Sequence, residues 1–318
     1  MKMISIMVPC YNEKSNIMEL YQRIVKAFSE LKKYDYEIIF ADNASQDGSI
    51  DILKDLAQKD NRVKVIVNNR NFGVERSSTN AFLQCYGDAA IIIASDLQDP
   101  PELIPEFIRH WEAGYKLVLG KKQSTEEKYL IKNARKLYYA LLEKISDNGH
   151  IKNVTGYGLY DKSVMDMLRW LDDPLPYTRG IICDLGYSYK LVEYGKNERK
   201  TGKSSYNYYR YFDAALWGIV SSSKKPLRLI TLVGLSLTII LAICLVASIV
   251  TTIMKITNVY YVFTNFLLLL LSFIILCLGV IGEYISLILL KVTKRPFTTS
   301  KEVLNINNTG ENNKMFGH

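Results

Sequence analysis

Short apolar runs alternate with stretches of helical periodicity along the first part of the chain. The apolar runs predict strands at Met3 to Pro9, Tyr36 to Ala41, Val63 to Val67, Ala89 to Ile93 and Lys116 to Leu119. Helices are predicted between them, at residues 16–31, 50–58, 77–86 and 103–113. Strands that alternate with helices indicate an α/β fold, with a mostly parallel sheet covered by helices on both faces.

Polar loops follow the predicted strands, most clearly Ala94 to Glu102 after the run with three isoleucines. Ligands of open α/β sheets lie at the carboxyl ends of the strands, so Asp96, Gln98 and Asp99 are expected to face a crevice. Such hard oxygen ligands suit a divalent ion that substrate phosphates also hold. The alternative is an ordinary strand-to-helix turn, in which Asp99 and the two prolines start the next helix.

The later part of the chain has a different pattern. No residue is charged from Leu229 to Met254 or from Thr257 to Gly282, and each stretch exceeds the roughly 20 residues that a membrane-crossing helix needs. This length predicts a transmembrane hairpin and disfavours two buried helices of a soluble core. Lysines and arginines flank both stretches, which places the N-terminal domain and both termini in the cytoplasm at a cell membrane. No signal peptide is expected before that domain.

Four segments follow from these patterns: a domain at 1–205, an interfacial helix at 206–225, a transmembrane hairpin at 226–292 and a tail at 293–318. Residues 130–145 predict a helix that packs in the core. Residues 153–161 are expected to be a loop or the end of a strand, and the basic stretch at 195–205 a mobile lid. The Asn-rich tail after Ser300 is expected to be disordered.

Charge and cysteine content narrow the function classes. The chain has 318 residues and a net charge of +8, and such a positive charge is compatible with binding of nucleic acid. Nine cations against three carboxylates lie between Lys190 and Arg228, beside the predicted membrane segment, so lipid phosphate is the nearer explanation and no nucleic-acid partner is expected. The five cysteines show no metal-ligand spacing and indicate a reducing compartment.

Five motifs in order resemble one family. They are Pro9 to Glu13, Asp42 with Ser45 and Asp47 to Gly48, Arg70 to Gly73, Gly87 to Asp88, and Asp96 to Glu102. The chain is similar through these motifs to the family 2 glycosyltransferases of the GT-A fold. Within them it resembles the polyisoprenyl-phosphate hexosyltransferases, the group of the bactoprenol glucosyltransferases and dolichyl-phosphate mannose synthase. The resemblance runs from about residue 3 to 300.

The resemblance implies inverting transfer of a hexose from a nucleotide sugar, with UDP as the favoured nucleotide, to polyprenyl phosphate at the cytoplasmic membrane face. It implies a homo-oligomer, a tetramer by analogy. Asp96 and Gln98 would hold Mg²⁺ or Mn²⁺, and Asp96 and Asp99 are the implied catalytic residues. The residues implied to bind the nucleotide sugar are Pro9, Tyr11, Asn12, Glu13, Asp42, Asn71 and Lys122. The residues implied to bind the acceptor phosphate are Arg199, Lys203 and Ser204.

The chain also departs from the family pattern. Ala94 stands where relatives usually have the first metal aspartate, Asn43 and Ala44 follow Asp42 where relatives often have a second aspartate and a glycine, and Lys122 replaces an arginine. The position of a proposed catalytic aspartate aligns with Gly156. These departures leave a catalytically weakened membrane scaffold as the alternative function. A polysaccharide-extruding enzyme is disfavoured, because two spans are too few to line a sugar channel.

Overall fold

The computed structural model describes residues 1–123, 154–171, 185–195, 259–292 and 298–306, and the single helical residues Ser236, Ile239 and Ile243. The chain divides into two compact units. One comprises Met1–Lys136, His150–Asn207 and Lys294–His318, and the other comprises Leu137–Gly149 and Tyr208–Thr293. The predicted helix at 130–145, the lid, the interfacial helix and the predicted acceptor-phosphate residues Arg199, Lys203 and Ser204 lie outside the described residues.

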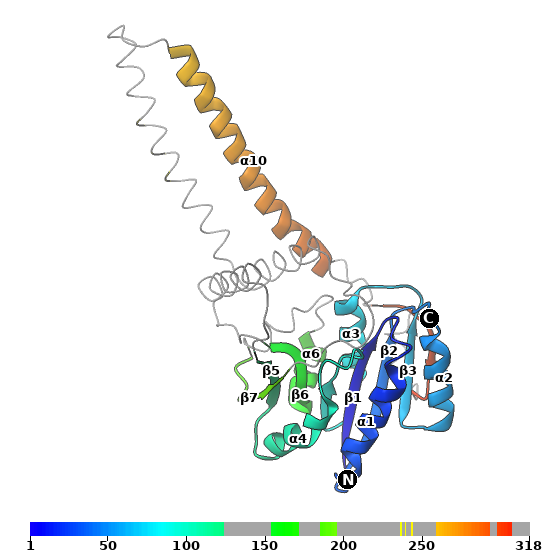
Figure 1. Cartoon of the computed structure of the whole chain (residues 1–318). Helices are drawn as coiled ribbons and strands as arrows, with labels where there is room; N and C mark the ends of the chain where they lie inside the picture. Colours follow the sequence, from blue (N-terminus) through cyan, green and yellow to red (C-terminus); the bar gives the residue numbers. More distant parts are fainter. Residues whose placement is uncertain are drawn as a thin grey trace. The chain divides into compact units, whose positions relative to one another are not determined.

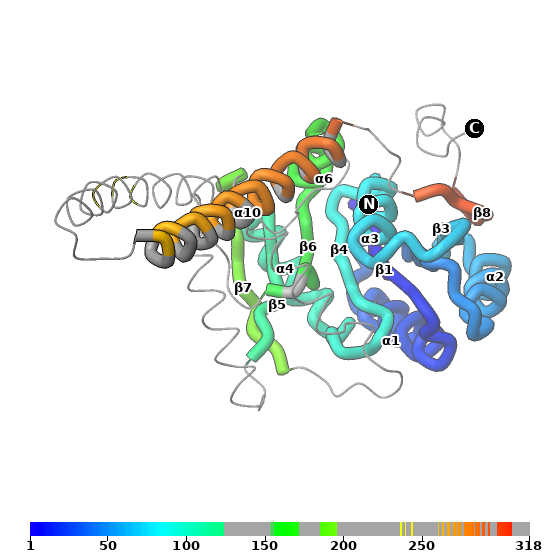
Figure 2. The backbone as a smooth tube through the Cα atoms, turned by 90° about the horizontal axis from the view of Figure 1, so that it is seen from above, coloured from blue at the N-terminus to red at the C-terminus, as the bar shows by residue number. Residues whose placement is uncertain are grey.

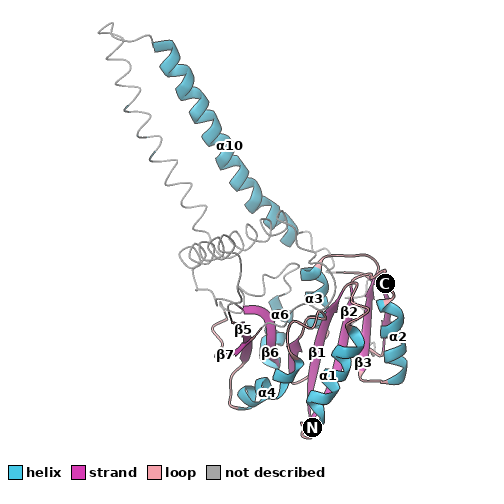
Figure 3. Ribbon diagram, in the orientation of Figure 1, coloured by secondary structure: helices cyan, strands magenta, loops and turns pink. Residues whose placement is uncertain are grey.

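An eight-stranded mixed sheet forms the first unit, with the strand order β7-β5-β6-β4-β1-β2-β3-β8 (Figure 3). Six strands are mutually parallel, and β6 and β8 run antiparallel to their neighbours. The bounds are β1 (Lys2–Cys10), β2 (Tyr34–Asp42), β3 (Val63–Asn68), β4 (Ala89–Ile92), β5 (Leu117–Lys122), β6 (Val154–Asp161), β7 (Tyr189–Tyr194) and β8 (Ser300–Leu304). The α/β fold with a mostly parallel sheet is therefore confirmed.

Two expectations about strands were wrong. Residues 154–161, expected to be a loop or strand end, form β6 between β4 and β5. Its two glycines hide the alternation in which Tyr157 and Leu159 enter one core and Tyr160 the other. Residues 300–304 of the tail form β8, which pairs with the edge of β3. The tail has little apolar periodicity because ladder hydrogen bonds, rather than side-chain burial, hold this short edge strand.

Helices cover both faces of the sheet (Figure 2). One face packs against α1 (Ile17–Ser29), α2 (Ser49–Lys59) and α4 (Ile104–Glu112), which the short 3₁₀ turn η1 (Pro101–Leu103) precedes. The other face packs against α3 (Val74–Leu83) and α6 (Lys162–Leu171). Strand residues alternate between the two cores, as with Ile6 on one side and Met7 on the other. The carboxyl ends of the six parallel strands share one edge of this sheet.

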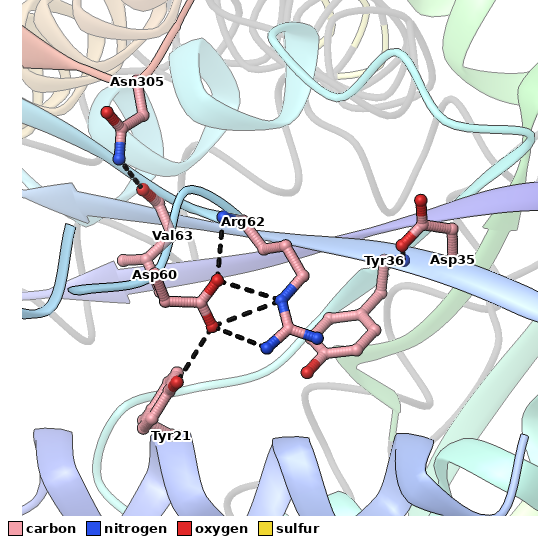
Figure 4. A network of polar contacts seen from close by, with 7 residues as sticks. All are labelled: Tyr21, Asp35, Tyr36, Asp60, Arg62, Val63 and Asn305. Atoms are coloured by element: carbon pink, nitrogen blue, oxygen red, sulfur yellow. Dashed lines mark hydrogen bonds and ion pairs between the residues drawn. The ribbon is translucent and has the colours of Figure 1, made fainter. Parts of the chain in front are cut away.

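The turn between α2 and β3 lies at the opposite, amino edge (Figure 4). Asp60 accepts hydrogen bonds from the backbone and guanidinium of Arg62 and, at 2.9 Å, from the hydroxyl of Tyr21. Asn305, just after β8, donates its amide to the carbonyls of Ala57 and Val63 at 2.7 and 2.9 Å. Every polar group named in this turn has a hydrogen-bond partner, so the turn stabilises the fold.

The described part of the second unit is mainly α10 (Val259–Val292), a helix of 34 residues (Figure 1). Many of its apolar side chains are exposed, among them Phe263, Leu271, Leu278, Ile285 and Val292. Among the described residues, none of the helices has both the length and the apolar character needed to cross a membrane.

Candidate active site

Two loops interlock at the carboxyl ends of β1 and β2. The backbone N–H of Asn12 donates to Ser45 Oγ at 2.9 Å, and Asn12 Oδ1 accepts from the N–H of Gln46 at 2.8 Å. The N–H of Glu13 donates to Ser49 Oγ at 3.1 Å, at the start of α2. These reciprocal bonds hold the predicted nucleotide-binding motif rigidly. Pro9 is the second-last residue of β1, and the Tyr11 side chain is exposed at the surface.

Asp42 lies at the last position of β2 with its side chain fully buried. Its Oδ1 accepts from the N–H of Ser45 at 2.9 Å, whereas Oδ2 has no hydrogen-bond partner among the described residues. Burial raises the pKa of this carboxyl above its ordinary value, although the hydrogen bonds from Ser45 partly oppose the rise. A buried acceptor without a partner costs about 1–3 kcal/mol, which makes Oδ2 a candidate acceptor for a donor group of a ligand.

The side-chain amides of three asparagines form a hydrogen-bonded network that begins at Asn43, the residue after Asp42. Asn43 Oδ1 accepts from Asn68 Nδ2 at 3.1 Å and from the N–H of Phe72 at 3.0 Å, and Asn43 Nδ2 donates to Asn71 Oδ1 at 3.0 Å. An aspartate at 43 has no donor for the last contact, which explains why an asparagine suits this chain. Asn71 Oδ1 also accepts from the N–H of Gly73 at 2.9 Å. Asn71 is predicted to bind the nucleotide sugar, but this oxygen stabilises its own loop.

Three of the four described non-glycine residues with a positive φ lie at the same edge, and the fourth, Asn305, lies at the amino edge. Asn12, Ala44 and Leu97 have φ values of 55°, 64° and 59°, in the left-handed region that residues with a Cβ rarely adopt. They lie in the loops after β1, β2 and β4 respectively. Strained residues of this kind persist where the surrounding structure holds them and are frequent at binding sites. The observation therefore supports a functional role for this edge.

The loop from Asp96 to Glu102 follows β4. Its residues alternate in burial, so Ala94, Asp96 and Gln98 are partly exposed while Leu97 and Asp99 are buried. Asp96 Oδ1 accepts from the N–H of Gln98 at 3.2 Å. The two predicted metal ligands therefore share the accessible side of the loop. No group of three or more His, Cys, Asp and Glu side chains suited to a metal occurs in the described ranges.

Asp99 makes two contacts with strands at the far side of the sheet. Its Oδ1 accepts from the Tyr194 hydroxyl at 2.6 Å, and the Lys122 ammonium lies 3.4 Å from the same oxygen. Tyr157 of β6 donates its hydroxyl to the carbonyl oxygen of Pro100 at 2.5 Å. Sequence reasoning named Asp99 and Lys122 but missed both tyrosines, because they lie outside every motif and come to the loop only through strand order.

Gly156 of β6 has a φ of 94°, and a Cβ built there meets nothing within 4 Å among the described residues. An aspartate at this position would have room but an unfavourable backbone conformation. Cys10, at the end of β1, is also unsuited to catalysis. Burial and the nearby Asp42 carboxylate raise the pKa of its thiol well above the usual range, so the thiol is protonated.

A mixed, mostly parallel α/β sheet with interlocked loops at its carboxyl edge, a buried acceptor and an acidic loop after β4 defines a GT-A-like protein. The profile described as Glycosyl transferase family 2 matches residues 5–167. A bactoprenol glucosyl transferase from Shigella phage SfX is 35% identical over 92% of this chain and 97% of its own length. The chain thus belongs to the family 2 glycosyltransferases, which makes it an enzyme of the sugar-transferring class.

Two further similarities are as follows. A prophage bactoprenol glucosyl transferase homolog from Escherichia coli (strain K12) is 33% identical over 94% of this chain and 99% of its own length. Among solved structures, mannosyl-3-phosphoglycerate synthase from Rubrobacter xylanophilus matches with a TM-score of 0.48 and 16% identity, over 71% of this chain and 74% of that chain. The sequence relatives cover nearly the whole chain, including its apolar C-terminal part.

Proposed function

We propose that this enzyme transfers a hexose from UDP-hexose to polyprenyl phosphate, with inversion at the anomeric carbon, at the cytoplasmic face of the cell membrane. The product is a lipid-linked sugar for modification of a cell-envelope glycan. The observation that carries this proposal is the near full-length similarity to bactoprenol glucosyl transferases, which extends beyond the sheet into the apolar C-terminal part.

The buried carboxylate of Asp42 supports uridine as the nucleoside. Among the described residues, Oδ2 is the carboxylate oxygen without a hydrogen-bond partner, because Oδ1 is held by the N–H of Ser45. Uracil offers a single ring N–H to such an oxygen, whereas guanine offers a ring N–H and an amino group and is best matched by two open oxygens. The backbone of Asn12 and Glu13, hydrogen-bonded to Ser45 and Ser49, lies in the neighbouring loop. A UDP-sugar is therefore the donor that this geometry fits best.

The oxygen donors of Asp96 and Gln98 suit Mg²⁺ or Mn²⁺. Both side chains lie on the accessible side of the loop, and a small hard cation of this kind takes its remaining ligands from substrate phosphates and water. When bound, such an ion supplies positive charge that stabilises the leaving diphosphate. Ala94 shares the accessible side, so a single carboxylate would serve where relatives usually have two.

The acceptor needs little activation by the protein. The second pKa of a phosphate monoester is near 6, so its oxygen is already anionic at cytoplasmic pH and can attack the anomeric carbon. A general base is then dispensable, in agreement with Gly156 where relatives often carry an aspartate. The role of the protein is to align the two substrates and to offset charge on the leaving diphosphate, for which Lys122 is placed beside the acidic loop. Arg199, Lys203 and Ser204 are the proposed contacts of the acceptor phosphate.

Membrane attachment follows from the same proposal. A polyprenyl tail remains in the bilayer, so the enzyme must work at the head-group plane. The uncharged stretches Leu229 to Met254 and Thr257 to Gly282 and the exposed apolar side chains of α10 support a two-helix anchor, with the basic flanks inside. The homo-oligomer implied by the family resemblance stays a prediction.

The deciding experiment is transfer of radiolabel from a panel of UDP-, GDP- and dTDP-hexoses to undecaprenyl phosphate in membranes, with and without EDTA. A chloroform-soluble product from a UDP-hexose that EDTA abolishes is the expected result. Product from a GDP-hexose alone would overturn the assignment of the base, and product that survives EDTA would overturn the metal assignment. A folded protein that binds UDP and yields no lipid-linked product from any donor would favour the scaffold alternative.

A further inference from the structure

The acidic loop after β4 is fastened at three successive places. Asp99 contacts Tyr194, the carbonyl of Pro100 accepts from Tyr157, and Glu102 forms a two-bonded ion pair with Arg23 of α1 at 2.8 and 2.7 Å. Its first part, with Asp96 and the strained Leu97, has the Gln98 N–H as an internal contact. The end of β4, where the N–H of Ile93 donates to the carbonyl of Met7, holds the predicted metal ligands from one side, and the contacts of the later part hold them from the other.

Tyr194 and Tyr157 act on that later part from outside the family motifs. Their rings meet edge to face with centroids 5.3 Å apart, and both are nearly fully buried. Burial raises the pKa of Tyr157, so its hydroxyl remains a donor at any pH in the cell. A buried hydroxyl with a fixed partner and a packed ring restrains the loop more firmly than an exposed contact.

Gly120 of β5 makes room for this pair. A Cβ at Gly120 would lie 2.7 Å from a ring carbon of Tyr157 and 2.8 Å from one of Tyr194, closer than real contacts allow. The strand order brings β7, β5 and β6 side by side, so that one glycine and two tyrosines from three strands meet. Any side chain at 120 would displace both rings.

We propose that Tyr194 and Tyr157 are positioning residues, which hold the Asp96 to Glu102 loop in the conformation that binds the metal and diphosphate of the donor. This inference rests on the proposed function. Tyr194 has a second effect, because Asp99 Oδ1 is shared between its hydroxyl and Lys122. Without the hydroxyl, Asp99 draws the Lys122 ammonium closer and away from the diphosphate.

The test compares Tyr194→Phe with Tyr21→Phe, a matched control. Each change removes one hydroxyl that donates to an aspartate, but Tyr21 serves Asp60 at the amino edge (Figure 4). The first measurement is binding of UDP by calorimetry over a range of Mn²⁺ concentrations, with no acceptor present. Tyr194→Phe is expected to raise the Mn²⁺ concentration for half-maximal UDP binding about tenfold. Tyr21→Phe is expected to leave it within about twofold.

Two further variants separate positioning from folding. Tyr157→Phe removes only the bond to Pro100, and Gly120→Ala displaces both rings without changing a polar group, so both should move the Mn²⁺ dependence in the same direction. Thermal unfolding checks that each variant is folded. At Mn²⁺ concentrations below saturation, turnover of UDP-hexose should decrease because kcat decreases. Unchanged Mn²⁺ dependence in Tyr194→Phe, or an equal change in Tyr21→Phe, would overturn the proposal.

The same assay distinguishes this proposal from the proposed function. Wild-type protein that binds UDP with Mn²⁺ but makes no lipid-linked sugar would overturn the reaction alone, while the variants still report on the loop. Wild-type protein whose UDP binding ignores Mn²⁺ would overturn the positioning role, because the loop would then hold no metal.

Discussion

Asp42 at the carboxyl edge of the sheet differs from Asp60 and Asp161 at the amino edge in how far hydrogen bonds satisfy its carboxylate. At the amino edge, Asp161 accepts from Trp111, Lys116 and Ser163, and Asp60 accepts from Arg62 and Tyr21. At the carboxyl edge, Asp42 keeps one buried oxygen without a partner among the described residues. Satisfied carboxylates stabilise the fold, whereas an unsatisfied one is retained for a ligand.

The pKa values show the same contrast. Burial raises the pKa of Asp161, but hydrogen bonds from Ser163, Trp111 and Lys116 outweigh it and lower that pKa to about 2. The Arg62 guanidinium lowers the pKa of Asp60. Burial raises the pKa of Asp42, and its few hydrogen bonds do not compensate. Asp42 therefore keeps an electrostatic cost that Asp60 and Asp161 do not have.

Asp96→Asn should produce the largest effect. Loss of the Asp96 carboxylate, the predicted charged metal ligand, is expected to lower turnover of UDP-hexose by about 100-fold or more, because an amide offers the metal no charge. The unfolding midpoint should not change. Asp55→Asn is the matched control, since Asp55 is exposed and paired only with Lys59 in the part of the chain that the structure describes. Near wild-type turnover in Asp96→Asn would contradict the metal assignment.

Asp42→Asn tests the two edges directly against each other. The change removes a buried, incompletely satisfied charge, so the free energy of unfolding should stay constant or rise. UDP affinity should fall about tenfold, because a hydrogen bond to a charged group is worth about 1.5–3 kcal/mol. Calorimetry and thermal unfolding measure the two effects.

Asp60→Asn should behave in the reverse manner. It breaks a satisfied network, so it is expected to lose about 1–3 kcal/mol of stability and keep UDP affinity. If the two variants lost stability equally, the distinction between the edges would fail.

Acid unfolding should depend on Asp161. Its pKa is about 2 in the folded protein and about 3.9 in an unfolded chain. The ionised side chain therefore stabilises the fold above the unfolded value, and this contribution of about 1–2 kcal/mol is lost as the pH falls from about 4 to 2. Asp161→Asn should flatten the stability profile in that window. For Asp42, whose folded pKa is raised, the contribution has the opposite sign: it is present below about 3.9 and is lost as the pH rises through the folded value.

Gly156→Asp should have the smallest effect. The φ of 94° makes a side chain cost about 1 kcal/mol, and turnover should not increase, because the acceptor phosphate needs no base. Gly114→Asp is the control, since Gly114 has a φ of 98° and open space around it among the described residues. Increased turnover in Gly156→Asp alone would show that a base limits the reaction.

Sequence reasoning located β1 to β5, but not β6, β7 or β8, and it located most of the candidate site, because these features depend on local patterns. Short apolar runs mark buried parallel strands, and loops at their carboxyl ends meet at one edge whatever the details of packing. It therefore named Asp42, Asp96, Gln98 and Asp99. It missed β6 because two glycines interrupt the alternation, and it missed β8 because an edge strand is held by backbone hydrogen bonds.

The roles of individual side chains were harder to predict. Asn43 departs from the family pattern, and only the structure shows that its side-chain amide forms hydrogen bonds with Asn68, Phe72 and Asn71. Tyr194 is 95 residues from Asp99, and no spacing rule links them. Such contacts depend on which strands become neighbours.

The sequence by itself determined the α/β class, the carboxyl-edge location of the site and the family, because periodicity and motif order are local properties of the chain. The tertiary structure decided which carboxylate oxygen stays open at Asp42 and which tyrosines fasten the acidic loop. The physical reason is that burial and hydrogen-bond satisfaction depend on neighbours from distant strands, and these are set only when the sheet order is complete.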